Sequence, residues 1–156
     1  MGRLDSDKNN RTVATNRRAR HDYAIDQVLT AGMVLLGSEV KSLRDGNVSI
    51  QEGHIDVRDG EVFLLNMHIR EYPFANRHNH PPLRPRKLLL NRSEIRRIHS
   101  QVAEKGCSAV PMRLFLERGR FKLEIGIGKG KRRVDKRHDL KAKQAAREVD
   151  RALKER

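Results

Sequence analysis

Apolar and polar residues alternate along much of the middle of this 156-residue chain, a pattern typical of half-buried β-strands. The alternation predicts six short strands, at about residues 23–30, 33–36, 53–58, 61–67, 108–117 and 121–128. Asp59-Gly60 and Arg118-Gly119-Arg120 each separate two consecutive strands. Both segments are therefore predicted to form tight hairpin turns.

A first helix is predicted after residue 37, where the apolar spacing changes from two to three or four. Ser38 is the expected N-cap, because a serine hydroxyl can accept a hydrogen bond from a free backbone N–H of the first turn. Val40 and Leu43 would face inward, and Gly46 follows the expected end of the helix.

A second helix is predicted to begin at Asn91, with Glu94 three residues later completing a capping box. Its inward face would consist of Ile95, Ile98 and Val102, and Gly106 follows it. Short strands with only two helices in about 110 residues favour a mainly β fold. We expect an OB-like closed barrel of about six antiparallel strands with two short helices, because closure removes exposed sheet edges.

The last 28 residues form a basic tail with helical spacing. Small apolar residues make one narrow stripe, at Ala142, Ala145, Ala146, Val149, Ala152 and Leu153. Since so thin a stripe buries little surface, the tail is predicted to be disordered when free and helical when bound to RNA. A coiled-coil dimer helix is the alternative.

Charge divides the chain into three regions and points to a polyanionic partner. The whole chain carries +14; residues 1–20 carry +4, residues 21–128 carry +3 and residues 129–156 carry +7. We therefore expect a basic N-terminal arm, one folded RNA-binding body and a basic C-terminal tail. No run approaches the roughly 18–20 apolar residues of a membrane span. With Cys107 as the lone cysteine, the chain is expected to be cytoplasmic.

Motifs for catalysis or metal binding are incomplete. His78 and His80 form a possible metal pair, but no second ligand cluster accompanies them. Residues 126–130 (GIGKG) lack the spacing and the Ser or Thr of a phosphate-binding loop. The acidic residues of the body show no two-metal pattern. We expect no enzyme activity, cofactor or metal; an RNA-processing enzyme and a generic ribosome-associated or structured-RNA-binding protein are the competing interpretations.

Features suited to RNA are clustered in two places. Residues 16–21 (NRRARH) combine arginines, which bind phosphates, with His21, which can stack on an unpaired base. The loop from Phe74 to Pro85 is rich in Asn, His, Arg and Pro, and favours a binding loop over a solvated one. Leu88 to Leu90 is interpreted as a core strand.

Five sequence blocks resemble the signature blocks of the SmpB family, the SsrA-binding proteins, in the family's order. They are residues 37–44 (GSEVKSLR), 66–69 (NMHI), 76–80 (NRHNH), 86–90 (RKLLL) and 135–137 (DKR), and the resemblance spans about residues 11–156. It implies an OB-like barrel that binds the tRNA-like domain of transfer-messenger RNA. The tail would enter the empty mRNA path of a stalled ribosome, for trans-translation and ribosome rescue. Elongation factor Tu and alanyl-tRNA synthetase would be partners through the RNA.

The resemblance also implies site residues. The RNA-binding positions would be Asn16, Arg18, His21, Glu39, Lys41, Arg77, Asn79, His80, Leu89 and Lys122. The ribosome-probing tail positions would be Lys129, Lys131, Arg132, Asp135, Lys136 and Arg137. The chain departs from the family pattern at Thr30, where many relatives have Glu, and at Val134, where many have an aromatic residue or His.

Overall fold

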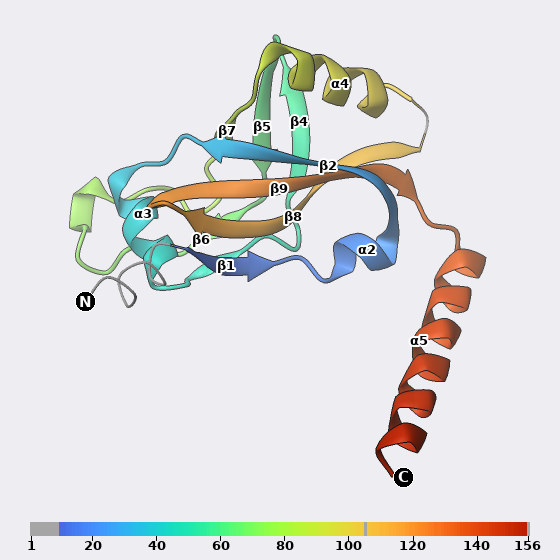
Figure 1. Ribbon diagram of the computed structural model, residues 1–156. Helices are drawn as coiled ribbons and strands as arrows, with labels where there is room; N and C mark the ends of the chain where they lie inside the picture. The colour runs from blue at the N-terminus through green and yellow to red at the C-terminus, as the bar shows by residue number, and fades with distance from the viewer. Residues whose placement is uncertain (1–9, 105, 156) are drawn as a thin grey trace.

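A seven-stranded antiparallel sheet forms the centre of the computed structural model, which describes residues 10–104 and 106–155 (Figure 1). The strands are ordered β1-β8-β9-β2-β7-β5-β4. Their bounds are β1 Arg11–Thr15, β2 Tyr23–Met33, β4 His54–Arg58, β5 Glu61–Leu65, β7 Arg86–Leu89, β8 Cys107–Glu117 and β9 Arg120–Gly130. A separate two-stranded sheet pairs β3 (Val48–Ser49) with β6 (His68–Ile69).

The predicted closed barrel is wrong, because β1 and β4 remain the two edges of the sheet. The sheet curls until Gly53, just before β4, lies against β8; a Cβ added there would come within 2.9 Å of Pro111 Cγ. Pro111 has no N–H, and its carbonyl already accepts a 2.9 Å hydrogen bond from the Asn16 side chain. Pro111 therefore offers β4 no backbone N–H, and β4 approaches β8 here through side-chain packing.

The N-terminal part of the chain joins the folded body earlier than the charge pattern indicates. Residues 11–15 form β1, which pairs antiparallel with β8, and α2 (Arg18–Asp22) follows with Ala19 buried. The predicted strand at 33–36 is also wrong. Strand β2 continues to Met33, and the following residues lead into the next helix.

The strand pattern of the body is otherwise confirmed. Both predicted hairpin turns form, with positive φ at both central residues: 50° and 76° at Asp59-Gly60, and 50° and 77° at Arg118-Gly119. Positive φ at both positions defines the type I′ turn, whose twist matches that of the flanking strands. These turns fix the registers of β4 with β5 and of β8 with β9.

Helix α3 (Gly37–Arg44) begins two residues earlier than predicted, because its N-cap is Leu36, not Ser38. Glu39 Oε1 accepts a 2.9 Å hydrogen bond from the Leu36 N–H, while the Ser38 hydroxyl bonds instead with His80. Helix α4 (Arg92–Val102) confirms its predicted capping box. Asn91 Oδ1 accepts a hydrogen bond from the Glu94 N–H at 2.9 Å.

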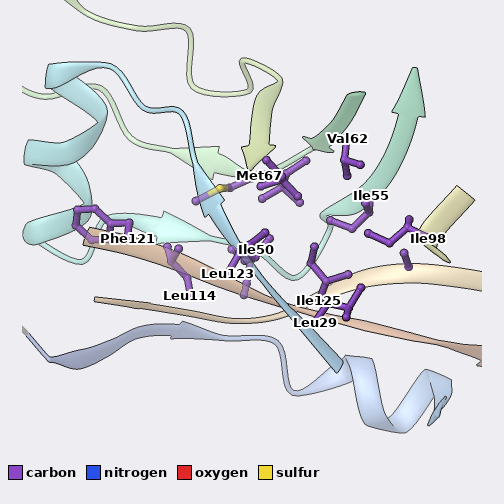
Figure 2. Packing of buried hydrophobic residues seen from close by; sticks show 14 of the residues in the cluster. Leu29, Ile50, Ile55, Val62, Met67, Ile98, Leu114, Phe121, Leu123 and Ile125 are labelled. Carbon is purple, nitrogen blue, oxygen red and sulfur yellow. The ribbon is translucent and has the colours of Figure 1, made fainter. Parts of the chain in front are cut away.

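The main core lies between the curled sheet and helix α4, which covers β4 and β8. Its fully buried members include Leu114 and Leu123 of the sheet and Ile98 of α4 (Figure 2). A smaller cluster of Ala19, Val110 and Met112 attaches α2 to β8. The smaller cluster thus holds α2 against the sheet, while the main core supports the strands that follow.

The C-terminal tail forms one long helix, α5 (Arg133–Lys154), which projects from the body beyond β9 (Figure 1). The predicted C-terminal helix is confirmed. Its disorder in the free protein stays a prediction. No helix in the described part of the chain is both long enough and apolar enough to span a membrane.

Candidate nucleic-acid interface

A buried charge cluster, formed by Glu39, Arg84 and Arg86, anchors the loop before β7 to helix α3. Glu39 and Arg86 are completely buried, and Arg86 Nε donates to Glu39 Oε2 at 2.5 Å. Arg84 Nη2 donates to the other carboxylate oxygen, also at 2.5 Å. Arg86 Nη1 further donates to the Met67 carbonyl. The cluster therefore joins three segments that are distant in sequence.

Burial by itself would raise the pKa of Glu39. Hydrogen bonds from Arg84, from the Leu36 N–H and from Arg86 outweigh that effect, so the pKa lies below its usual value. The carboxylate thus stays charged inside the protein because three donors replace its water.

A second buried contact positions the NRHNH segment (residues 76–80) through its last residue, His80. His80 Nε2 donates to the Ile69 carbonyl at 3.0 Å, since a carbonyl oxygen can only accept. Its Nδ1 then accepts from the Ser38 hydroxyl at 2.8 Å. Both ring nitrogens are therefore used inside the fold, so His78 and His80 cannot act together as a metal pair.

Asn16 is also buried and links the end of β1 to β8. Its backbone N–H donates to the Met112 carbonyl at 2.8 Å, and its side chain bonds to Pro111. The expectation that Asn16, Glu39 and His80 face RNA is therefore corrected. Their side chains lie inside the protein and shape the backbone near the surface.

Most of the other RNA-binding candidates reach the surface. Arg18 is exposed on α2, with its guanidinium 3.6 Å from Glu52. His21, at the end of the same helix, is half-buried and bonds to Asp22. Lys41 and Arg77 are exposed, Leu89 is 52% exposed on β7, and Lys122 pairs with Glu117 at 3.2 Å.

Asn79 is half-buried and clamps the loop that contains Arg77. Its Oδ1 accepts from the Tyr72 N–H at 2.9 Å, and its Nδ2 donates to the Tyr72 carbonyl at 2.7 Å. A side-chain amide thus replaces a strand partner and holds the loop at both backbone groups of one residue.

A second charge cluster, which we call the tail root, joins α2 to the beginning of α5. Lys136 Nζ lies 3.2 Å from Asp22 Oδ1, and Lys131 pairs with Asp139. The Lys131 N–H also donates to the Asp22 carbonyl at 2.8 Å. The hydrogen bond from His21 holds the pKa of Asp22 below its usual value, with Lys136 adding to the effect.

The remaining tail candidates lie near this cluster. Lys129 is exposed at the end of β9, and Arg137 is exposed on α5. Asp135 Oδ2 accepts from the Arg132 N–H at 3.3 Å, which caps the helix.

A surface cleft of about 550 Å³ separates α5 from α2 and β2. Exposed cations lie around α2 and α5 and, at the opposite end of the molecule, around α3 and the 72–80 loop (Figure 1). Others, such as Arg92, Arg96 and Arg97, lie on α4.

Sequence reasoning missed two features of these clusters. Arg84 and Arg86 neutralise Glu39 from 45 and 47 residues away. Asp22 pairs with Lys136 of the tail. No local sequence pattern signals either pairing, because each depends on the tertiary fold.

Comparison with known proteins gives a consistent result. The family model described as SmpB protein matches residues 13–155. Curated SsrA-binding proteins are similar over nearly their whole length: 52% identity in Symbiobacterium thermophilum, covering 91% of this chain and 90% of the relative, and 48% in Thermobifida fusca, covering 97% and 95%. A solved structure described as "tmRNA-SmpB: a journey to the center of the bacterial ribosome" is similar with a TM-score of 0.65 and 41% identity. That match covers 81% of this chain and 93% of the other.

Proposed function

This chain belongs to the SmpB protein family, and from that premise we propose that it is a non-catalytic adaptor that binds transfer-messenger RNA and delivers it to stalled ribosomes. The observation that carries the proposal is the full-length similarity to SsrA-binding proteins, at about half identity. The net charge of +14 fits a polyanionic partner. The adaptor works in trans-translation, which rescues the ribosome and tags the incomplete peptide.

The folded body binds the tRNA-like domain of the RNA. Its direct contacts come from the exposed candidates, namely Arg18, His21, Lys41, Arg77, Leu89 and Lys122. Arg18 and Arg77 can each form two hydrogen bonds to a phosphate. The buried residues Asn16, Glu39 and His80 support this surface from inside, and Asn79 fixes the loop beneath Arg77.

The tail, from Lys129 onward, probes the decoding centre and the vacant mRNA channel. All six of its candidate residues are charged. Asp135, Lys136 and Arg137 lie on α5, a helix that extends away from the body, and the other three lie just before it (Figure 1). The stripe of small apolar residues is exposed along the helix. Since a helix of this kind is marginal in water, we propose that the tail loses order when free and becomes fully helical on RNA.

The proposal places the protein in the cytoplasm, with elongation factor Tu and alanyl-tRNA synthetase as partners that reach it through the bound RNA. These partners act on the same tRNA-like domain. Their association with this chain should therefore disappear when the RNA is digested.

A binding experiment with three RNAs tests the proposal. Purified protein is titrated against the tRNA-like domain of transfer-messenger RNA, an ordinary tRNA and a random duplex at physiological salt, where nonspecific charge binding is weak. We expect selective binding to the tRNA-like domain. Equal, salt-sensitive binding to all three would instead favour a generic structured-RNA-binding protein.

A further variant tests whether the body and the tail have separate roles. Replacing Asp135, Lys136 and Arg137 together by Ala should change affinity for the tRNA-like domain less than about threefold, because these residues lie on α5. The same variant should abolish tagging of peptides on stalled ribosomes in a reconstituted translation reaction. Equal loss of both activities would contradict separate roles for the body and the tail.

A further inference from the structure

Phe74 is the most exposed large apolar residue of the described chain, with 81% of its surface accessible. Its ring meets the half-buried Tyr72 edge to face, with 5.5 Å between the ring centroids and 67° between the planes. Lys41 of α3 lies over the Tyr72 ring, its Nζ 5.5 Å from the centroid. We call these three side chains the aromatic platform. One face of Tyr72 is covered by a cation, whereas the Phe74 ring remains open to solvent.

The platform is held in place by its own loop. Asn79 binds both the N–H and the carbonyl of Tyr72, as described above. The Ala75 N–H donates to the same carbonyl at 3.1 Å, and the His78 N–H donates to Ala75 at 3.0 Å, which forms the 3₁₀ turn η1 (Asn76–His78). Phe74 is thus exposed on an ordered turn, so a ligand would meet a preformed surface with little ordering entropy to lose.

The surroundings of the platform are polar and include cations. A surface cleft of about 540 Å³ adjoins it, lined by His68, Arg70, Glu71, Tyr72, Pro73, Asn76, Asn79 and Pro82. Arg70 in this lining is exposed, and so is Arg77, three residues after Phe74; Glu71 is the one acidic group in the lining. Open aromatic rings next to cations are how proteins hold unpaired nucleotides, with the base stacked on the ring and the phosphate on the cation.

We propose that the aromatic platform stacks one unpaired RNA base on Phe74, with Arg70 or Arg77 on the adjoining phosphate. The site lies beside α3, at the opposite end of the molecule from α2 and α5 (Figure 1). It is therefore a second point of contact, which fixes how the RNA lies along the body. The inference rests on the proposed function only in taking RNA as the ligand.

The absence of tryptophan from the sequence allows a direct optical test. In a Phe74→Trp variant, a base stacked on the indole should quench its fluorescence strongly. The matched control is Phe115→Trp on β8, where Arg113 already covers the ring at 4.3 Å from its centroid. Titration with the tRNA-like domain alone, and separately with ribosomes lacking that RNA, shows which RNA supplies the base.

The energetic test is Phe74→Ala, which removes an exposed ring and leaves the core intact. Its affinity for the RNA that quenches Phe74→Trp should fall by about fivefold or more, as for other base-stacking rings. The slope of log affinity against log salt should not change, because no charge is lost. Arg70→Gln and Arg77→Gln are compared, and the variant that removes the phosphate contact should instead lower that slope by about 0.7–0.9.

The outcomes separate this inference from the proposed function. If wild-type protein shows no preference for the tRNA-like domain, the proposed function fails whatever Phe74 does. If wild-type binding is selective, but Phe74→Ala binds both RNAs as wild type does, the platform is refuted alone. Loss of affinity without quenching of Phe74→Trp, or quenching equal to that of Phe115→Trp, would also overturn stacking.

Discussion

The buried charge cluster and the tail root each hold a carboxylate between basic side chains, but one is buried and the other is partly exposed. In each, a carboxylate is held between two groups that can carry positive charge: Glu39 between Arg84 and Arg86, and Asp22 between His21 and Lys136. Glu39 is completely buried, whereas the Asp22 side chain is 39% exposed. Water and salt weaken the exposed interactions but hardly reach the buried ones. The first cluster therefore fixes the fold, and the second can exchange its partners for RNA phosphates.

The largest effect is expected for Glu39→Gln, which leaves two arginines without a carboxylate. Removing one partner of a buried ion pair usually costs about 3–5 kcal/mol, because the remaining charge has lost its solvent. Urea unfolding at neutral pH measures the change in unfolding free energy. Asp22→Asn is the matched control at the tail root. A similar small loss of unfolding free energy in both variants would contradict the difference between the two clusters.

Acid should weaken the buried cluster next. The folded-state pKa of Glu39 lies below its ordinary value of 4.5, so its contribution to stability is present above that value. The contribution is lost as the pH falls through the folded-state pKa. Wild type and Glu39→Gln should therefore differ most in unfolding free energy at neutral pH and converge in acid. A difference that stays constant down to about pH 3 would show that ionisation of Glu39 does not matter.

The smallest stability change is expected at the tail root. Replacing Asp22 and Asp139 together by Asn should hardly change the urea-unfolding midpoint, as is usual for exposed ion pairs. The first turns of α5 should nevertheless lose protection, because Lys131 and Lys136 no longer tie them to the body. Hydrogen exchange of the amides in residues 134–140 measures this, and high salt should reproduce part of it in wild type. Unchanged exchange would mean that other contacts hold the helix.

Local features of the fold were predictable from the sequence because their signals are local. The turns at Asp59-Gly60 and Arg118-Gly119 and the cap at Asn91 each lie within a few residues of their partners. Strand β1 was missed because its partner, β8, lies about 100 residues later and β1 has few apolar residues of its own. Barrel closure was wrongly predicted. Pro111 lies within a predicted strand, and a proline there indicates that one edge of that strand stays unpaired.

The sequence predicts the residue types of the candidate site, but only partly which of their side chains are exposed. The sequence indicates which side chains can bind RNA, yet it does not show that Glu39 would face Arg86 and not solvent. Burial of a charged residue depends on partners distant in the chain, and here four further strands and a loop separate Glu39 from the two arginines. Phe74 shows the opposite case. Its segment of the sequence is largely apolar, and only the fold shows that its side chain is exposed.

The central claim is that exposed cations bind the RNA while the buried charge cluster only maintains the fold. Affinity for the tRNA-like domain is measured against salt concentration for wild type, Arg18→Gln and Glu39→Gln, at a temperature where all three are folded. We expect Arg18→Gln to lower the slope of log affinity against log salt by about 0.7–0.9, with Glu39→Gln leaving it unchanged. A reduced slope for Glu39→Gln together with an unchanged slope for Arg18→Gln would contradict the claim.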